Sequence, residues 1–401
     1  MAPSVMNTAI LTTLAVAFAV MWIPRLRATR TWLAMVTPLA SIIGSGFLIL
    51  GPILQGSYGK FAPVMMAVLC VVAWAFGAAI RYSIAEQDRA STKEPSVERI
   101  ERISEVVLGF AYIISVAYYL NLFGAFGTRL IWPDSPDAAR LLTTSIFLVI
   151  LVVGWLWGFK SLERMEYLSV SIKLSIIGGL LVGLGLFFMG KVEAGTLIIL
   201  PPKETGWAGL TLAFGLLVTV QGFETSRYLG EEYTAKERIR SMRWAQIFST
   251  LIYMVYTILL AYSFAALPLP VKETAIIGLM AQVAPILPIL LVIAALAAQF
   301  SAAVADTAGA GGLADELTHH RLPPKRAYLL LVVAGLVLTW TANIYEIIAL
   351  ASRAFAAYYA LQSIVALLHA HRNGQWSRVA LFAALTALGV AIVLFGTPAE
   401  G

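Results

Sequence analysis

Long apolar runs recur along the whole chain, and they limit the fold more than any other feature of the sequence. An α-helix needs about 20 mostly apolar residues to cross the hydrocarbon core of a bilayer. Twelve segments meet this requirement: 4–23, 31–55, 61–84, 103–128, 141–159, 165–190, 207–228, 244–266, 275–305, 327–342, 345–368 and 377–396. The pattern predicts an all-α polytopic membrane protein with 12 transmembrane helices.

The composition excludes several other classes of protein. Charged residues make up 12% of the chain, whereas soluble domains usually carry about 25%. A single cysteine, Cys70, leaves no internal disulfide framework and no thiolate metal cluster. The four histidines form two pairs without an accompanying cysteine or carboxylate pattern, so we expect no metal and no cofactor. The net charge of +6 comes without a basic stripe interleaved with aromatic residues, which argues against nucleic acid as a partner.

The basic residues predict the direction of the helices. Most of them fall in alternate loops, at 25–30, 81–102, 160–164, 227–243, 321–326 and 372–378. Loops rich in lysine and arginine stay in the cytoplasm, so both termini are expected outside. The first segment does not read as a cleavable signal peptide, because residues 1–8 contain no lysine or arginine.

The ten central helices suggest an internal repeat. Two consecutive units of five helices must be inverted relative to each other, because five is odd, and such repeats build many secondary transporters. We expect one extra helix at each end. The predicted domains are 1–30, an extra N-terminal helix and loop; 31–190, the first five-helix repeat; 207–370, the inverted second repeat; and 371–401, a C-terminal helix and tail.

Glycine interrupts the first helix of each unit. Gly44 and Gly46 flank Ser45 in one, and Gly222 lies between Gln221 and Glu224 in the other. Glycine also permits close helix packing in membranes, so packing is the alternative reading of each position. An interrupted helix exposes backbone groups that lipid cannot satisfy, so it persists only where it lines a polar cavity. Freed N–H groups attract a carboxylate and freed carbonyls attract an ammonium group, so the matched positions indicate a binding site.

Three motifs carry a resemblance to a known family. They are "IIGSGF" at 42–47, "GFETSRYLGEE" at 222–232 and "GGLADELTHHRLPPKRAY" at 311–328. Together they resemble the amino acid–polyamine–organocation (APC) superfamily, which has the leucine-transporter fold, and the resemblance covers roughly residues 31–370. Two departures stand out: a helix at 4–23 precedes the first glycine-broken helix, and His319–His320 replace a usual aspartate–glycine pair.

The broken helices and the helix at 103–128, which faces the substrate in the resembling fold, supply the candidate binding residues. Tyrosines also populate membrane-interface belts, which is the alternative reading for the aromatic members. The candidates for substrate binding are Ile43, Gly44, Ser45, Gly46, Val218, Gln221, Gly222, Phe223, Tyr118 and Asn121.

Five ionisable residues are candidates for proton coupling or gating, because charges within a span are costly and usually functional. Lys173 resembles a lysine of proton-coupled relatives, with snorkelling to the membrane surface as the alternative. Glu224 is a candidate proton acceptor, with an ion pair to Arg227 as its alternative. Asp306 is expected at the end of the helix 275–305, where capping is the simpler role. Glu346 and Arg353 share a helix face and are either an outer gate or a structural ion pair.

These features together predict a secondary active transporter for an amino acid or related amine, coupled to protons, in a bacterial inner membrane. A non-transporting sensor or accessory subunit with the same fold is one alternative, and a permease for another small solute or cation is another. An enzyme is not expected, because no nucleophile–base pair or metal cluster is recognisable, and no G-x-x-x-x-G-K-[ST] motif is present. The expected partners are the substrate, the proton and the lipid bilayer; a homodimer is left open.

Overall fold

The fold is described from a computed structural model, over residues 3–44, 46–89, 94–132, 135–156, 166–230, 232–265 and 271–399. These residues form helices and connecting segments, without a strand among them. The first half contains α1 (Pro3–Met21), α2 (Pro24–Arg27), α3 (Arg30–Ile42), α4 (Gly46–Tyr58), the 3₁₀ helix η1 (Gly59–Phe61), α5 (Ala62–Arg89), α6 (Pro95–Thr128), α7 (Pro136–Leu156) and α9 (Glu166–Glu193). The second half contains α10 (Gly206–Gly215), the 3₁₀ helices η2 (Leu217–Val220) and η3 (Phe223–Tyr228), α11 (Ala235–Ala261), α12 (Ala275–Val283), α13 (Leu287–Leu317), α14 (Pro324–Thr341), α15 (Ile344–Arg372) and α16 (Trp376–Phe395).

The helical content identifies a polytopic membrane protein. Nine segments of the described chain are long and apolar enough to cross a bilayer, against the twelve that we expected. Among the nine, Gly46–Arg89 joins α4, η1 and α5 in one segment, whereas α3, the interrupted segment α10–η3 and the continuous helix α14 are not included. The count of twelve and the inverted repeat therefore stay predictions.

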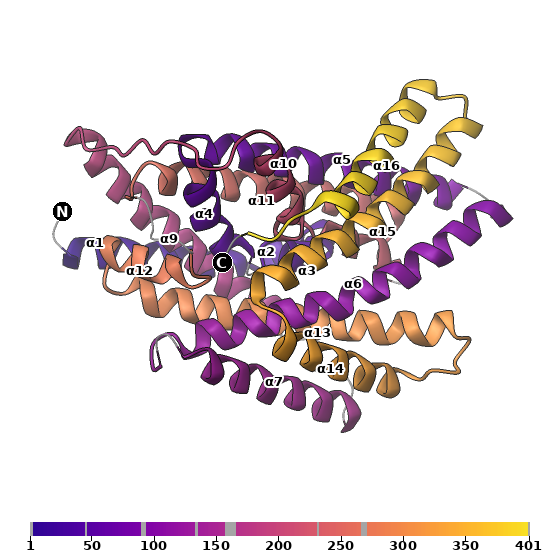
Figure 1. Cartoon of the computed structure of the whole chain (residues 1–401), viewed down its shortest axis with the longest axis horizontal. Coiled ribbons are helices and arrows are strands. Elements are labelled where there is room, and N and C mark those ends of the chain that lie inside the picture. The colour runs from indigo at the N-terminus through magenta and orange to yellow at the C-terminus, as the bar shows by residue number, and fades with distance from the viewer. Residues whose placement is uncertain are drawn as a thin grey trace.

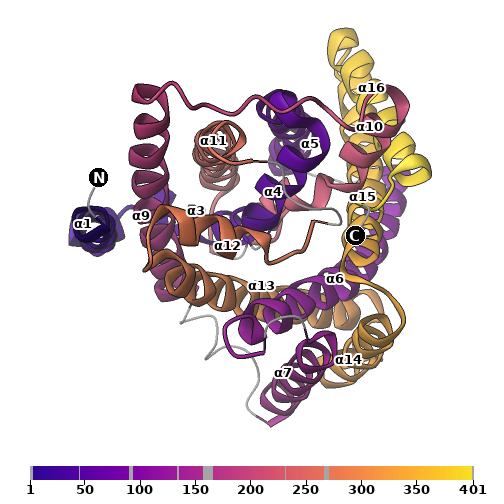
Figure 2. The same ribbon diagram turned by 60° about the vertical axis from the view of Figure 1, so that its left-hand side comes forward.

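The long helix α6 packs against both α13 and α15, and these three lie along one side of the interrupted segments, with α5, α9 and α11 on the other sides; α1, α7 and α16 lie at the periphery (Figures 1 and 2). Burial follows this arrangement: 67% of the apolar stretch of α15 is buried, against 17% for α1. The extra helix α1 packs on α9, where Gly179 allows the Ile10 carbonyl to approach; a Cβ at Gly179 would lie 3.0 Å from that oxygen.

One predicted helix is wrong in its boundaries. The segment 275–305 is two helices, since α12 ends at Val283 and α13 runs from Leu287 to Leu317. Ala284 is extended (φ −156°, ψ 139°) because it precedes Pro285, and a residue before proline is driven out of the helical region. At the other end, α13 continues twelve residues beyond the predicted end at 305. Asp306 is therefore a buried residue inside α13, and the expected helix-end capping role is corrected.

The loops rich in basic residues are predicted to lie on one side of the membrane, and we call that end of the molecule the arginine-rich end. Contacts between residues far apart in the sequence join these loops. Arg227 Nη2 lies 2.8 Å from Glu101 Oε1, and the two side chains are only 7% and 6% exposed. Gln87 also donates to Glu101. Two exposed pairs, Arg30 with Glu237 and Arg372 with Glu94, lie at the same end.

At the opposite end, the extended connection after α9 crosses to α10 (Figure 2). The Lys60 N–H donates to the Leu200 carbonyl at 2.8 Å, and the Glu204 N–H donates to the Ser57 carbonyl at 2.8 Å. Gly59 has a positive φ of 53°, and a Cβ there would lie 2.5 Å from the Leu200 oxygen. This end of the molecule is therefore closed by backbone contacts.

Replacing Arg227 with methionine should destabilise the protein strongly, because it leaves Glu101 buried without its cationic partner. Removing one member of a buried pair typically costs about 3–5 kcal/mol. Thermal unfolding of the purified protein in detergent measures the loss. The double variant Glu101→Met, Arg227→Met should recover most of it, whereas Arg30→Met, at an exposed pair, should leave the stability close to that of the wild type. An Arg227→Met protein as stable as the wild type would contradict this account.

Candidate functional site

The first predicted interruption is present. The helix α3 ends at Ile42, Ile43 leaves the helical region (φ −83°, ψ 57°), and α4 begins at Gly46. Ser45, expected to bind substrate, lies outside the described residues. The break falls among buried residues, so its free backbone groups face protein rather than lipid.

The second predicted interruption is longer than the first. The helix α10 ends at Gly215 and is followed by η2. Gln221 is then fully extended (φ −88°, ψ 178°) and Gly222 has a left-handed φ of 119°. A φ of this sign is open to glycine at little steric cost, which explains the residue type at 222.

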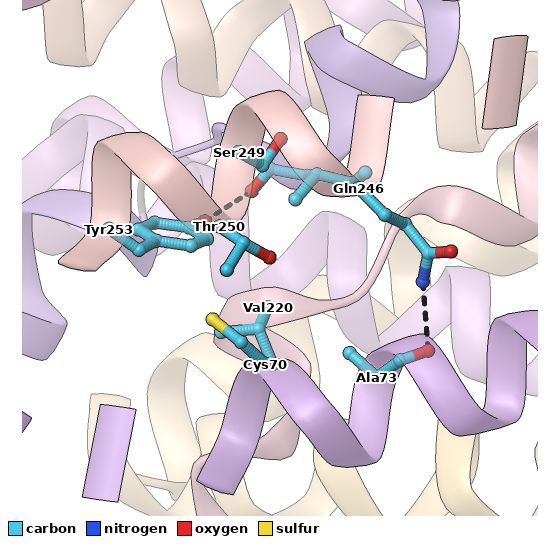
Figure 3. A pocket seen from close by; sticks show the side chains of 8 residues that line it. Cys70, Ala73, Val220, Gln246, Ser249, Thr250 and Tyr253 are labelled. Carbon is cyan, nitrogen blue, oxygen red and sulfur yellow. Dashed lines mark hydrogen bonds between the residues drawn. The ribbon is translucent and has the colours of Figure 1, made fainter. Parts of the chain in front are cut away.

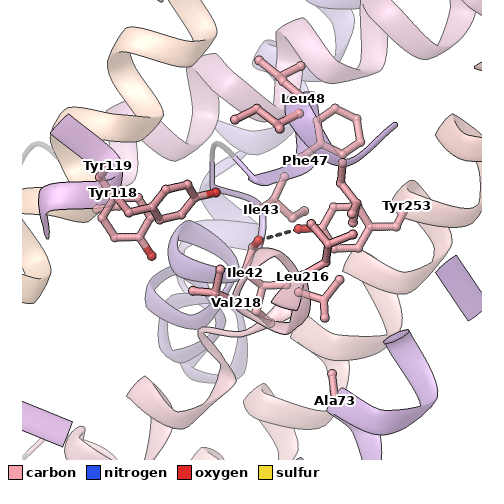
Figure 4. Packing of buried hydrophobic residues seen from close by; sticks show 14 of the residues in the cluster. Ile42, Ile43, Phe47, Leu48, Ala73, Tyr118, Tyr119, Leu216, Val218 and Tyr253 are labelled. Atoms are coloured by element: carbon pink, nitrogen blue, oxygen red, sulfur yellow. Dashed lines mark hydrogen bonds between the residues drawn. The ribbon is translucent and has the colours of Figure 1, made fainter. Parts of the chain in front are cut away.

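The two interruptions touch each other, and a glycine on each side makes the contact possible. A Cβ at Gly46 would lie 2.8 Å from the Thr219 Cα, and a Cβ at Gly222 would lie 2.6 Å from the Ile42 nitrogen. Ile42, Ile43 and Val218 accordingly cluster beside Tyr253 in Figure 4. Backbones this close leave no room for side chains at either glycine. Gly44 is less tightly enclosed, with its nearest neighbour, the Ser41 carbonyl oxygen, 3.2 Å from a Cβ position.

Hydroxyl groups from neighbouring helices form hydrogen bonds with the backbone groups that the interruptions leave free. The Tyr253 hydroxyl of α11 lies 2.6 Å from the Ile42 carbonyl oxygen (Figure 4) and 2.9 Å from that of Thr219, so it serves both interruptions. Ser352 of α15 accepts a hydrogen bond from the Val218 N–H at 2.9 Å and donates to the Gly215 carbonyl at 2.7 Å. An unsatisfied backbone group in a membrane interior costs several kcal/mol, so these hydroxyls stabilise the broken geometry.

Lys173 lies at the first interruption. Its side chain comes from α9, is 1% exposed, and donates to the Ala40 carbonyl of α3 at 2.6 Å. This burial is incompatible with the alternative in which the amine snorkels to the membrane surface. The ammonium group therefore contacts the last turn of the helix that ends at the binding region.

Glu224 lies at the second interruption. Its Oε2 accepts the Gly222 N–H at 3.0 Å and the Tyr359 hydroxyl at 2.8 Å. Arg227, considered from the sequence as its ion-pair partner, pairs with Glu101 instead. The Gln221 side chain also lies beside Tyr359, at 3.3 Å. The Glu224 side chain thus stabilises the backbone turn at Gly222 through a hydrogen bond from the Gly222 N–H.

Aromatic rings surround Glu224. Phe223 stacks on Tyr359 with ring centroids 5.1 Å apart, and Tyr359 stacks on Phe76 of α5 at 5.2 Å. Tyr118 is buried on α6 beside Tyr119. Asn121 points elsewhere: its amide donates to Thr339 of α14 at 2.9 Å. The structure therefore directs the Asn121 amide toward α14.

Asp306 is the second buried carboxylate of this region. Ser115 of α6 donates a hydrogen bond to it, and Glu224 lies near enough to interact with it electrostatically. Tyr112 and Tyr119 lie within electrostatic range of both carboxylates. Two acidic groups from different helices thus share a tyrosine-lined interior.

Glu346 makes a local contact, whereas Arg353 contacts a residue 43 positions along the chain. Glu346 is exposed and completes a capping box with Asn343 at the start of α15. Arg353 donates from Nε and Nη2 to the Gly396 carbonyl, at 2.9 and 2.6 Å. Glu346 therefore lies at an exposed helix start, and Arg353 contacts the residue after α16 rather than a glycine of either interruption.

A small pocket lies between the two interrupted segments and the helices α5 and α11 (Figure 3). Ile42 and Val220 line it together with Cys70, Ser249 and Tyr253. Its volume of about 10 Å³ has room for one water molecule. It is too small for an amino acid, so it is a feature of the packing behind the site.

No metal centre is evident in the described part of the chain. Within those residues, no three His, Cys, Asp or Glu side chains lie close enough to hold an ion. His320 instead contacts Asp315 at 2.8 Å on the surface. The buried polar groups described for this region include hydroxyls, backbone carbonyls, the carboxylates of Glu224 and Asp306 and the amine of Lys173.

Sequence reasoning missed the residues that satisfy the interruptions. Tyr253 and Ser352 are polar side chains inside otherwise apolar segments, which was the one signal available in the sequence. Nothing local, however, indicates which backbone groups they reach 211 and 137 residues away.

The comparisons with known proteins agree with the resemblance in the motifs. A sequence profile of APC superfamily transporters matches residues 24–396, which covers everything after α1 up to the C-terminal tail. An uncharacterized protein of Aquifex aeolicus (strain VF5) is 40% identical over 391 residues, which span 94% of this chain and 93% of that protein. The chain belongs to the APC superfamily of transporters.

Proposed function

We propose that this protein is a secondary active transporter of a bacterial inner membrane, which moves an amino acid or a related amine by alternating access and is coupled to protons. The observation that carries the proposal is the contact between the two interruptions, at Gly46 with Thr219 and at Gly222 with Ile42. Two broken segments that cross within the protein supply both N–H and carbonyl groups at one place, as a zwitterion requires.

The substrate is proposed to bind where the two interruptions cross. Ile43, Gly44 and Gly46 border the proposed site on one side, and Val218 and Gln221 border it on the other. The Val218 N–H is bound to Ser352 in this conformation, so a substrate would have to replace that contact. Phe223 and Tyr118 supply aromatic walls. An ammonium group has carbonyls, Glu224 and aromatic faces available there, and a carboxylate has freed N–H groups.

Proton coupling is proposed to involve the buried ionisable groups. Lys173 is a charge that contacts α3 directly, so loss of its proton would weaken that contact and release the broken segment. Glu224 and Asp306 are the acidic groups available to take up a proton. Each binds a hydroxyl of a different helix, Tyr359 of α15 or Ser115 of α6, so a change in protonation would alter interhelical contacts.

A screen of purified protein tests the proposal first. Thermal unfolding is measured with amino acids, amines and inorganic cations, and the stabilising compound is then tested for uptake into proteoliposomes under an imposed pH gradient. Stabilisation by an amine or amino acid with uptake supports the proposal. Binding without flux would favour the sensor alternative, and stabilisation by another solute or a cation alone would favour the other permease.

Gly46→Ala should abolish most transport while leaving a folded protein. The added methyl group meets the Thr219 backbone, and overpacking of this kind typically costs about 1–3 kcal/mol. We expect the initial rate of uptake to fall by about tenfold or more, which corresponds to about 1.4 kcal/mol. Gly109→Ala is the matched control, because no atom lies within 4 Å of a Cβ at that position of α6. Uptake by Gly46→Ala at the wild-type rate would contradict the site.

Lys173→Ala should flatten the pH dependence of transport. The variant removes the titratable group in contact with the Ala40 carbonyl, so protonation can no longer alter that contact. Initial rates across a pH series, with the compound found in the screen, measure the effect. Lys203→Ala, at an exposed lysine, should keep the wild-type profile. A Lys173→Ala profile that matches the wild type would exclude Lys173 from coupling.

A further inference from the structure

The C-terminal tail returns to the second interrupted segment. After α16 the chain extends over α10, where the Thr397 N–H donates to the Thr211 carbonyl at 3.0 Å and the hydroxyls of the same two residues lie 3.3 Å apart. Ala399, farther along, is buried. Residues 396–399 are called the strap below.

Arg353 fastens the strap to α15. Two of its guanidinium nitrogens, Nε and Nη2, donate to the Gly396 carbonyl. A charged donor that makes two hydrogen bonds to one oxygen is a strong, oriented contact. The strap thus lies between α10, through Thr211, and α15, through Arg353.

Gly215 joins the strap to the binding region. A Cβ at Gly215 would lie 1.8 Å from the Thr397 carbonyl oxygen, so only glycine lets the two backbones meet. The Gly215 carbonyl itself accepts from Ser352, which also accepts the Val218 N–H. Three contacts therefore connect Thr397 to the second interruption.

We propose that the strap holds α10 against α15 and keeps the second interruption closed at the end opposite the arginine-rich end. Release of the strap lets α10 move away from α15 and opens the binding region on that side. Arg353 acts as a positioning residue in this step, since it contacts the strap and not the substrate. The role of the strap in a transport cycle rests on the proposed function.

The geometry favours a releasable contact over a permanent one. The strap is a short extended segment, and its hydrogen bonds to Thr211 and Arg353 involve its own backbone. The ring contact nearest to it, Trp207 with Phe395, lies between α10 and the last residue of α16. Segments held by few contacts open at low free energy.

The test measures access to α10 and needs no substrate. Cys70→Ala removes the only cysteine of the sequence, and Ala213→Cys adds a reporter at a position of α10 that is 3% exposed. The rate of labelling by a membrane-impermeant maleimide is measured on purified protein. Truncation after Phe395 and, separately, Gly215→Ala should each raise this rate by about tenfold, the size of a population shift of about 1.4 kcal/mol.

Two controls keep the result interpretable. Gly278→Ala, where no atom lies within 4 Å of a Cβ, should leave the labelling rate unchanged. If the truncated protein does not fold, Gly215→Ala and Arg353→Gln still test the strap. Unchanged labelling in the folded strap variants would overturn the proposal. Because labelling is independent of uptake, this result is separate from any failure of the proposed transport function.

Discussion

The structure depends on one constraint: backbone N–H and carbonyl groups freed inside a membrane protein must find partners within the protein. Two helices of this chain are broken among buried residues, and each break frees several such groups. The hydroxyls of Tyr253 and Ser352 form the hydrogen bonds that backbone groups of a regular helix would have formed. Because Tyr253 reaches both breaks, α11 ties the two interruptions into one unit.

Close approach of the two breaks is the second requirement. Gly46 and Gly222 each lie against the backbone of the other segment, so the interruptions share one surface. The Tyr253 hydroxyl of α11 can contact both breaks because this shared surface is small, while Ser352 of α15 contacts the second break. A side chain at either glycine would separate the segments and leave carbonyl oxygens without donors.

The buried ionisable side chains also find their hydrogen-bond partners within the protein. Lys173 binds a carbonyl, Glu224 binds an N–H and a hydroxyl, and Asp306 binds a hydroxyl. The Arg227–Glu101 pair, at the arginine-rich end, is an ion pair between buried side chains.

The sequence by itself determined the apolar helices, the positions of both interruptions and the family, because each depends on local composition or on a short motif. Hydropathy and the glycine positions are properties of neighbouring residues, and they predicted the breaks at Gly44–Gly46 and at Gly222. Pro285 is the local sequence feature that separates α12 from α13, but the apolar residues on both sides of it predicted one continuous helix. Three kinds of contact were decided by the tertiary structure alone. Tyr253 and Ser352 form hydrogen bonds with the backbone groups of the interruptions, and Arg227 pairs with Glu101 rather than with Glu224. Arg353 binds the C-terminal strap. These partners lie between 34 and 211 residues apart, and which groups meet over such separations is set by how whole helices pack, which no local pattern encodes.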